Sequence, residues 1–457
     1  MYNELFSLPI LRDSRLNRSM SQLQKKRVVV TGIGIVSPVG NTRESSWNAV
    51  IEGKSGIGKI THFDTKDCTC QIAAEVKNFD PCFTLETPLY PRGKNSEALS
   101  QPINPKDKKK MDRFIHLSIA ASLEAYQDSG LDAHRDQISP TMIGVNIGVG
   151  IGGLPLIEES HITILEKGFR RVTPFLIPQI IPNLAAGQVS IILHTQNTNY
   201  ACVSACASSA HSIGESFRLI QRGESTVMIA GGAEAVICPL GIGGFAAMRA
   251  LSTRNDAPEK ASRPFDTGRD GFIMGEGAAT LILEEYEFAK KRGAKIYGEV
   301  CGYGASSDAY HITQPLEDGD GGYRAMKHAL EESGVPSSQV DYVNAHGTST
   351  PLGDIQECKA VSRLLPDAKN LHVSSTKSMT GHLLGAAGAI EAAFSLLAIR
   401  DGIVPPTINL ENIDPACAET GLHFTPNKAV KKPIASAISN SFGFGGTNVS
   451  LMFKKAT

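Results

Sequence analysis

The chain has 457 residues, 41% of them hydrophobic, and a formal net charge of −1. A chain of this size buries a large core, as one big domain or two fused ones, and its near-zero charge gives no electrostatic case for nucleic-acid binding. The longest stretch without Asp, Glu, Lys or Arg, Val172–Gly214, is broken by prolines, glycines and asparagines, so no membrane-spanning helix is predicted.

The first 26 residues are predominantly basic. Five of them are basic (Arg12, Arg15, Arg18, Lys25 and Lys26) and two are acidic (Glu4 and Asp13). Because Met20 begins the segment just ahead of the first strand, we expect residues 1–26 to be a flexible tail or upstream extension of a cytoplasmic protein. The alternative is a transit peptide for a mitochondrion or plastid. The cysteines are scattered without zinc-ligand spacing, which favours a reducing compartment with free thiols.

Five apolar runs predict buried strands. They are Val28–Gly34, Met142–Gly148, Ser225–Gly232, 280–284 and Lys295–Val300. A helix is predicted over Glu285–Arg292, and the polar, proline-rich stretch Glu86–Lys106 predicts a surface insertion. Strands that alternate with helices indicate an α/β architecture. We place a boundary at Gly293, which divides the chain into halves over residues 27–293 and 294–457.

Cys206 lies where an apolar run with β character gives way to a helical pattern. Apolar residues recur at helical spacing from Ala210 to Ile220, and Gly223 ends the pattern. Free N–H groups at the start of a helix carry partial positive charge and favour a thiolate, the nucleophilic form of cysteine. The turn therefore predicts a site of covalent catalysis, although a cysteine among small residues also fits a buried hydrophobe.

Two histidines downstream lie in glycine-rich turns. His346 ends an apolar strand, and strand ends are where α/β sheets place their chemistry. His382 lies near the start of a helix in which Gly385 and Gly388 have helical spacing, and the helix dipole there disfavours a protonated imidazole. A neutral imidazole can donate a hydrogen bond to a developing oxyanion. Each histidine alone also fits a hydrogen-bonded core or surface residue, but the two turns together, with Lys377 close by, indicate a catalytic pair.

A glycine-rich segment near the C-terminus, Asn440–Asn448, places Phe444 between Gly443 and Gly445. Glycines on both sides open backbone conformations that are closed to other residues. One use is to aim a backbone N–H at an oxyanion while the phenyl ring acts as a movable gate. The alternative is a simple glycine-rich hairpin turn.

Together these segments resemble the β-ketoacyl-acyl-carrier-protein synthases of the thiolase superfamily, from about Arg27 to the C-terminus. Further matching segments are Val28–Gly34, Ala250–Thr253, Arg263–Asp266, Arg269–Phe272 and Gly275–Ala278. The last of these fits the second, elongating type of synthase better than the first. The resemblance implies a thiolase-like duplicated α/β fold, in which two halves of one topology stack as five layers, α-β-α-β-α. It implies no cofactor and no required metal.

The resemblance also implies an activity, the decarboxylative Claisen condensation that elongates fatty acids by two carbons. Cys206 would take an acyl group from acyl carrier protein, with the backbone N–H groups of Cys206 and Phe444 as the oxyanion hole. His346 and His382 would promote decarboxylation of malonyl-acyl carrier protein and stabilise the enolate. The carbanion would then attack the acyl group on Cys206.

Supporting roles carry over to further positions. Lys377 would orient the site electrostatically with Glu357 as its partner, and Asp354 would be structural. The positions implied for substrate binding are Thr348 and Thr350 for the pantetheine arm, Ile151 and Phe245 for the acyl pocket, Asp308 on a second mobile loop, and Phe442. Asn344 and Glu391 match positions near a monovalent-cation site in some relatives.

Two kinds of protein partner are implied. Acyl carrier protein is acidic, and the family docks it on basic residues that match Lys108, Lys109, Lys110, Arg170, Arg171 and Arg249. The lysine run alone also fits a solvated helix start. The family is homodimeric through sheet pairing near the nucleophile. With the uncharged run Val172–Gly214, this predicts a twofold interface that includes part of residues 190–204, in which Asn199–Val203 pairs with its own copy.

Three rival functions make different demands on the sequence. A degradative thiolase normally uses a second cysteine near the C-terminus, but the last cysteine here is Cys417 and Gly443–Gly446 contains none. A non-catalytic chain-length factor lacks the nucleophile, whereas Cys206 is present. A binding-only scaffold would form no covalent acyl adduct on Cys206.

Overall fold

The computed structural model describes residues 25–456, and ten of its strands join edge to edge in one sheet. The first half of the chain supplies β1 (Val28–Val36), β4 (Ile143–Gly148), β5 (Asn199–Tyr200), β6 (Val227–Glu234) and β7 (Gly277–Glu285). The second half supplies β8 (Gly298–Ser307), β9 (Tyr342–Asn344), β10 (His372–Ser374), β13 (Ser436–Gly443) and β14 (Thr447–Lys454). The tail predicted over residues 1–26 lies outside the described residues except for Lys25 and Lys26.

The two halves repeat one strand order. The sheet runs β1-β7-β6-β4-β5 in one half and β8-β14-β13-β9-β10 in the other, so the first, fifth, fourth, second and third strands are neighbours in both. In each half the first two pairings are antiparallel and the last two are parallel. The halves join where Val28–Val30 pairs with Gly298–Val300. The predicted boundary at Gly293 falls between α10 (Tyr286–Lys291) and β8, and stays a prediction.

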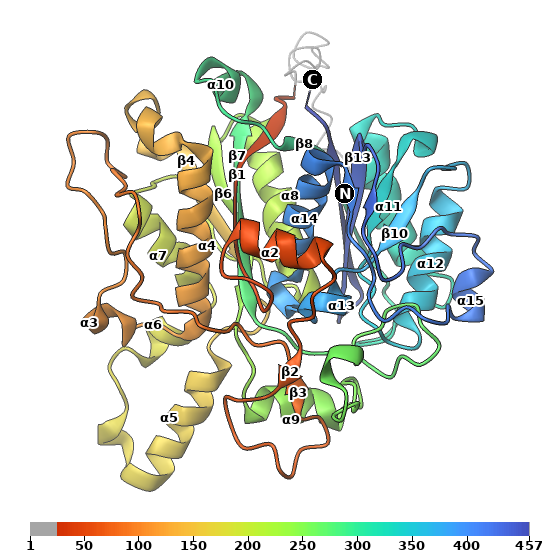
Figure 1. Ribbon diagram of the computed structural model, residues 1–457. Helices are drawn as coiled ribbons and strands as arrows, with labels where there is room; N and C mark the ends of the chain where they lie inside the picture. The colour runs from red at the N-terminus through yellow and green to blue at the C-terminus, as the bar shows by residue number, and fades with distance from the viewer. Residues whose placement is uncertain (1–24, 457) are drawn as a thin grey trace, which may run out of the picture.

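Helices cover both faces of each half-sheet and give the predicted five layers (Figure 1). The outer helices are α4 (Arg113–Ser129) and α7 (Leu184–Leu193) on one side, and α11 (Asp320–Ser333) and α12 (Gly353–Leu364) on the other. The middle layer is α8 (Ser208–Gln221) and α14 (Ala387–Asp401). Every residue of α14 from Ala387 to Ile399 is buried, as expected for a helix between two sheets. Close approach requires glycine at Gly34, where a Cβ would overlap the Ala121 carbonyl oxygen.

The remaining elements lie outside these layers, and apart from α5 they are short. The helices are α2 (Arg43–Ile51), α3 (Pro105–Lys108), α5 (Leu154–Lys167), α6 (Leu176–Ile180), α9 (Pro239–Ala247), α13 (Lys377–Thr380) and α15 (Pro415–Ala418), and the strands are β2 (Gly58–Lys59), β3 (Ile72–Ala73), β11 (Ile403–Val404) and β12 (Val430–Lys431). Within the described part of the chain, no helix is long and apolar enough to cross a lipid bilayer.

Each predicted strand is present, but β8 begins three residues late and extends to Ser307. The reason lies in the side chains before it. Lys295 and Tyr297 turn toward Asp128 on α4, with Lys295 Nζ 2.8 Å and the Tyr297 hydroxyl 2.7 Å from its carboxylate oxygens. The chain therefore joins the sheet ladder only after these side chains have reached the outer helix.

The predicted insertion at Glu86–Lys106 packs on the outer side of the first half. Gln127 Nε2 of α4 donates to the Thr87 carbonyl at 2.8 Å, and Arg135 Nε donates to the Pro91 carbonyl at 3.0 Å. Leu89 is buried against this face. None of its residues lines the active-site cavity described below.

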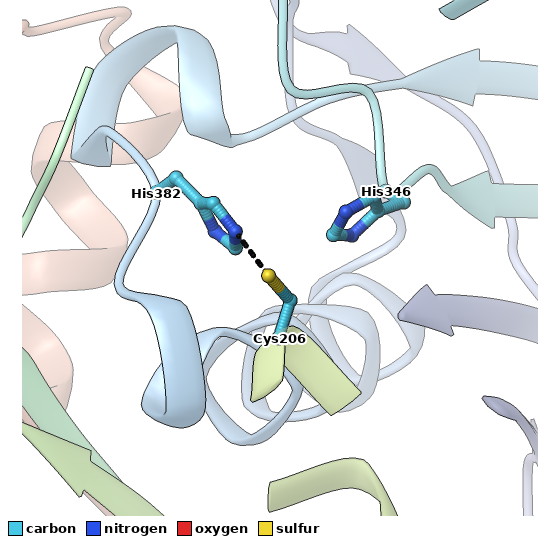
Figure 2. Close-up of side chains that lie close together, drawn as sticks. All are labelled: Cys206, His346 and His382. Atoms are coloured by element: carbon cyan, nitrogen blue, oxygen red, sulfur yellow. Dashed lines mark hydrogen bonds between the residues drawn. The ribbon is translucent and has the colours of Figure 1, made fainter. Parts of the chain in front are cut away.

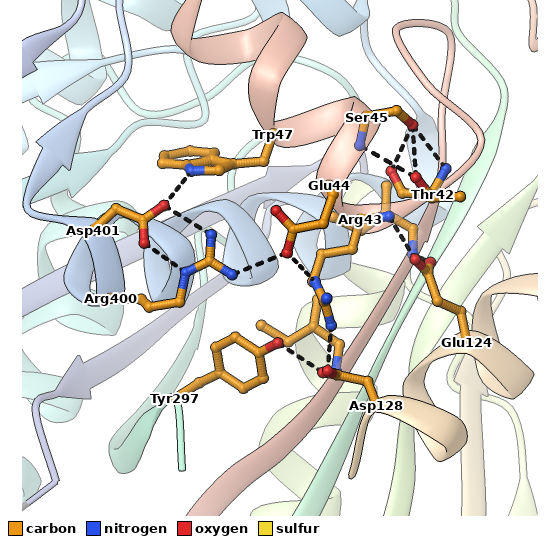
Figure 3. A network of polar contacts seen from close by, with 12 residues as sticks. Thr42, Arg43, Glu44, Ser45, Trp47, Glu124, Asp128, Tyr297, Arg400 and Asp401 are labelled. Carbon is orange, nitrogen blue, oxygen red and sulfur yellow. Dashed lines mark hydrogen bonds and ion pairs between the residues drawn. The ribbon is translucent and has the colours of Figure 1, made fainter. Parts of the chain in front are cut away.

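A polar network ties α2 to both halves of the molecule (Figure 3). The Trp47 indole N–H donates to Asp401 at 2.7 Å, at the end of α14. Arg400 in turn contacts Glu44 at 3.2 Å. On the other side of α2, the Arg43 backbone N–H donates to Glu124 of α4 at 2.8 Å. The helix therefore fixes the outer layer of the first half against the middle layer.

Candidate active site

Cys206 lies on a strained turn directly before α8. The preceding residue, Ala205, has φ of 49°, a left-handed conformation that is costly for a residue with a Cβ. Ser208 holds the turn closed, because its hydroxyl accepts from the Ser204 N–H at 2.9 Å and donates to the Ala205 carbonyl at 2.7 Å. A short 3₁₀ turn, η4 (Ala205–Ala207), then leads into α8. The turn-to-helix geometry expected from the sequence pattern is therefore present.

The structure brings both histidines to this cysteine (Figure 2). His382 Nε2 lies 3.0 Å from Cys206 Sγ. His346, two residues beyond β9, lies across from His382 with ring centroids 5.4 Å apart and planes at 88°. One ligand-forming atom from each of the three side chains falls within 4.8 Å of the others. Residues 140 and 176 positions from Cys206 in sequence thus converge on its sulfur, at a seam between the two halves.

The electrostatics of the site correct one expectation. Burial raises the pKa of Cys206 to about 11, and the Lys377 charge and the N–H groups of Phe444 and Cys206 offset this only in part. The resting group is therefore a thiol and not the thiolate expected from the helix start. Burial, with the Lys377 charge, holds the pKa of His346 and His382 well below the usual value. Both imidazoles are neutral beside a protonated sulfur.

Lys377 has a different partner from the one predicted. Its ammonium pairs with Glu391 on α14 and not with Glu357. Glu357 instead accepts from the backbone N–H groups of His346 at 2.8 Å and Gly347 at 2.7 Å. It thereby fixes the turn that presents the His346 ring. Burial raises the pKa of Glu357 and raises that of Glu391 to about 7.

Glu234 is a site residue that the sequence analysis missed. It ends β6, is fully buried, and accepts the N–H groups of Gly150 at 2.8 Å, Gly152 at 3.1 Å and Gly385 at 3.2 Å. Its oxygens also lie within 3.3 Å of the Ile151 nitrogen. Burial raises the pKa of Glu234 to about 7. A carboxylate at the end of an otherwise apolar strand was the available signal.

Asp354, for which a structural role is expected, is fully buried. Its carboxylate accepts from the Phe265 N–H at 2.9 Å and from the Ser349 N–H at 3.1 Å. Arg269 lies 3.6 Å away. Burial raises the pKa of Asp354 to about 6. Asp354 does not line the cavity, and it anchors the loop that follows His346.

A cavity of about 580 Å³ leads from the surface to the cysteine. The predicted residues that line it are Cys206, His346, His382, Phe444, Thr348, Thr350, Ile151, Phe245, Asp308, Phe442, Arg249 and Glu357. The Thr348 and Thr350 hydroxyls lie 3.2 Å apart, and the Phe245 and Phe444 rings are 6.2 Å apart. The volume is that of a small-molecule site rather than of a macromolecular groove.

The predicted docking residues, Arg249 excepted, lie outside the cavity. Lys108 ends α3, and Lys110 pairs with Asp107 at 2.8 Å. Arg170 and Arg171 are exposed on the short turn after α5. Arg249 alone lines the cavity. The predicted docking residues therefore lie on separate elements and do not form one continuous helix face.

Asn344 and Glu391 lie together behind the catalytic groups. Asn344 Nδ2 donates to the Glu391 carbonyl at 3.4 Å. Three buried oxygens here have no hydrogen-bond partner among residues 25–456: Asn344 Oδ1, Glu391 Oε2 and the hydroxyl of Ser439, which pairs with Asn344 in the sheet. Oxygen ligands of this kind suit a hard cation. The residues thus fit the cation site that the resemblance implied.

Comparisons with known proteins agree along most of the chain. The family model "Beta-ketoacyl synthase, N-terminal domain" matches residues 25–289, and "Beta-ketoacyl synthase, C-terminal domain" matches residues 297–411. The chain is 52% identical to 3-oxoacyl-[acyl-carrier-protein] synthase 2 of Vibrio harveyi, over 95% of this chain and 99% of the relative. It is 49% identical to the protein of that name from Synechocystis, over 95% of this chain and all of the relative.

Solved structures give the same match. A β-ketoacyl synthase from Burkholderia phymatum superposes with a TM-score of 0.83 at 36% identity, covering 94% of this chain and all of that one. A ketosynthase solved in complex with its type II polyketide synthase acyl-carrier protein superposes with a TM-score of 0.81 at 32% identity, covering 95% of this chain and all of that one.

Proposed function

This chain belongs to the β-ketoacyl synthase family, and we propose that it condenses malonyl-acyl carrier protein with an acyl group held on Cys206, in fatty acid elongation. The observation that carries the proposal is the approach of His382 Nε2 to within 3.0 Å of Cys206 Sγ, with His346 beside them. A nucleophile, a proton acceptor and a second imidazole thus meet in one buried cavity.

The first half-reaction is acyl transfer to the cysteine. The Cys206 sulfur attacks the thioester carbonyl of the acyl carrier protein while its proton passes to His382 Nε2, which is neutral and in contact with it. The N–H groups of Cys206 and Phe444 face the sulfur and stabilise the oxyanion. The bond between the acyl carbon and the carrier sulfur breaks, and the carrier thiolate takes the proton.

The second half-reaction is decarboxylation and carbon–carbon bond formation. Malonyl-acyl carrier protein loses CO₂, and the electron pair is left as an enolate whose oxygen accepts from the His346 and His382 imidazoles. The Nδ1 atoms of both rings have no partner within the described chain, so either tautomer is open to them. The carbanion attacks the acyl carbon and expels the Cys206 thiolate, which gives a β-ketoacyl product two carbons longer.

Acyl carrier protein is the proposed partner. A structural neighbour at 32% identity is a ketosynthase in complex with its acyl-carrier protein. The basic residues that would meet an acidic carrier here are Lys108, Lys109, Lys110, Arg170, Arg171 and Arg249. Arg249 at the cavity wall would contact the part of the carrier nearest the thioester arm.

We also propose a homodimer formed through β5. This strand ends the sheet, and its outer edge pairs with no other strand of residues 25–456. An unpaired edge is a template for a second chain. Val203 is 60% exposed and Ile191 68% exposed beside it, which supports an interface within residues 190–204. Light scattering of a fully active monomer would contradict this arrangement.

A monovalent cation near Asn344 and Glu391 is a further proposal, supported by their unpaired buried oxygens. When bound, such an ion would stabilise the packing behind Lys377, and no chemical step depends on it.

The test of the proposed function is a set of acyl carrier proteins loaded with acyl chains of graded length, each mixed with malonyl-acyl carrier protein. Mass spectrometry should find β-ketoacyl products two carbons longer than each acyl donor that is used. Cys206→Ala should abolish them, because the structure offers no second sulfur beside the two histidines. Product formation by this variant at the wild-type rate would refute the assignment.

A further inference from the structure

The three side chains at the reaction centre have the composition of a transition-metal site. A cysteine sulfur and two imidazoles are the ligands that Zn²⁺ prefers, and a site with three protein ligands leaves a fourth position open. Within residues 25–456 this is the only group of three or more potential ligand side chains close enough to share an ion. The open position here would face the cavity.

The distances are close to those of a tetrahedral ion. Bonds of about 2.3 Å to sulfur and about 2.0–2.1 Å to nitrogen place the ligand atoms about 3.5 Å apart. His382 Nε2 and Cys206 Sγ are 3.0 Å apart, and the ligand atoms of the three residues all lie within 4.8 Å. Side-chain shifts of about an ångström therefore bring all three onto one ion.

The ligand atoms are also available. No hydrogen bond within the described structure occupies the Nδ1 atoms of His346 and His382, so either ring can change tautomer without losing a partner at Nδ1. The hydrogen bond to the sulfur from a side chain of residues 25–456 is the one with His382 Nε2. The Lys377 ammonium opposes a cation nearby, but it is paired with Glu391.

We propose that Cys206, His346 and His382 bind one Zn²⁺ ion, which inhibits the protein reversibly. The thiol gives its proton to solvent as the sulfur–zinc bond forms. Bound zinc then removes the nucleophile and both imidazoles from catalysis at once. An acylated cysteine cannot contribute a thiolate, so acylation of Cys206 should protect the protein. The binding is independent of the proposed function, and only the effect on activity rests on it.

Zinc binding is tested first, on the full-length protein after treatment with a chelator. Titration against a chromophoric chelator should give one Zn²⁺ per chain. Cys206→Ala should weaken binding by a factor of at least a hundred, and capping Cys206 of the wild type with iodoacetamide should do the same without any substitution. Cys68→Ser and Cys82→Ser, which remove partly exposed thiols, are the matched controls and should bind zinc normally.

Spectroscopy and activity supply the second arm. Co²⁺ in place of Zn²⁺ should give a thiolate-to-cobalt charge-transfer band that Cys206→Ala lacks. Zn²⁺ should block acylation of the free protein but not the reaction of preformed acyl-enzyme with malonyl-acyl carrier protein, and a chelator should restore activity. Tight binding that survives both Cys206→Ala and the capped wild type would overturn the proposal, as would the absence of stoichiometric binding at micromolar zinc.

Discussion

The turns that follow β4 and β9 occupy equivalent places in the two halves, yet they present different chemistry. Each is held by a buried carboxylate, Glu234 in the first half and Glu357 in the second, which accepts successive backbone N–H groups of the turn. The first turn presents the apolar side chain of Ile151 to the cavity, and the second presents the imidazole of His346. The same arrangement of a buried carboxylate and backbone N–H groups thus holds an apolar side chain at the cavity in one half and an imidazole in the other.

A second pair of turns makes the same contrast. η4 begins at Ala205 with φ of 49°, and η7 (Leu384–Ala386) begins at Leu384 with φ of 48°. Each leads directly into a middle-layer helix, and the central residue is Cys206 in one turn and Gly385 in the other. The duplicated fold therefore repeats the backbone geometry of these turns, and the two halves differ in the side chain at the central position. In the proposed mechanism the first half holds the acyl group, and the second half activates the malonyl group.

The largest effects should come from the histidines. His346→Ala should raise the activation free energy of malonyl decarboxylation by about 3–4 kcal/mol, because an oxyanion donor is lost. The rate of decarboxylation should therefore fall by a factor of about a hundred to a thousand. Acylation of Cys206 should fall much less. His382→Ala should slow both steps, since His382 Nε2 lies 3.0 Å from the sulfur and accepts its proton in the proposed acylation step. Separate assays of radiolabelled CO₂ release and acyl-enzyme formation provide the measurement, and equal losses of both steps in His346→Ala would point to a collapsed site.

Glu357→Gln should have a smaller and selective effect. The substitution keeps the volume but replaces one carboxylate oxygen with an N–H₂ group that cannot accept from His346 or Gly347. We expect decarboxylation to fall by about tenfold, the loss typical of one hydrogen bond to a charged group, with acylation unchanged. The rates of Cys206 acylation and of malonyl decarboxylation, measured separately on one protein preparation, test this prediction. If acylation falls and decarboxylation does not, the turn held by Glu357 does not serve the malonyl half-reaction.

Glu234→Gln is the matched substitution in the first half. It should loosen the turn that carries Ile151, and we expect acylation by long-chain donors to fall by about three- to tenfold, within the range for the loss of one typical hydrogen bond. Short-chain donors, which reach less far into the cavity, should be affected less. Decarboxylation should keep its wild-type rate. If Glu234→Gln and Glu357→Gln have the same profile, the division of labour between the halves is wrong.

The reactivity of Cys206 should follow its raised pKa. Because only the thiolate is alkylated and the pKa of Cys206 is about 11, iodoacetamide modification should accelerate by about tenfold per pH unit from pH 7 to 9, with no plateau below about pH 10. The partly exposed cysteines Cys68 and Cys82 serve as internal references. A plateau below pH 8 would indicate a thiolate–imidazolium pair and would contradict the neutral state of His382.

The smallest effect should come from the carrier-docking lysines. Reversing Lys108–Lys110 to glutamate should raise the KM for acyl carrier protein a few-fold and weaken the salt dependence of the rate, because rim charges act mainly on association. Small thioester substrates, which need no docking, should react as before. An unchanged salt dependence would remove this patch from the docking surface.

The fold was largely predictable because its signals are local. Apolar runs such as Val28–Gly34 marked the strands, and the buried strands of the structure follow them closely. The extent of β8 was not predictable, since it depends on Lys295 and Tyr297 reaching a helix far away in sequence. The duplication likewise appears in the strand order and not in the residues.

Site residues were predictable where a characteristic turn sequence surrounds them. They were not predictable where contacts between elements distant in sequence determine the partner. Cys206, His346 and His382 stood out through the glycine-rich or small-residue turns around them. The pairing of Lys377 with Glu391 depends on α14 passing behind α13, and nothing local distinguishes Glu391 from Glu357. The protonation of Cys206 was mispredicted because a helix start favours a thiolate, whereas burial, which the sequence does not reveal, raises its pKa by more.

The most direct test of the division between the halves is the intact mass of the protein during one turnover. Incubation with acyl-acyl carrier protein alone should add the mass of one acyl group, mapped to the peptide that contains Cys206. Addition of malonyl-acyl carrier protein should remove that mass from the protein. CO₂ should be released from the malonyl group, and a β-ketoacyl product two carbons longer than the acyl donor should appear. Product formation while Cys206 remains unmodified, or an adduct that malonyl-acyl carrier protein does not discharge, would contradict the account.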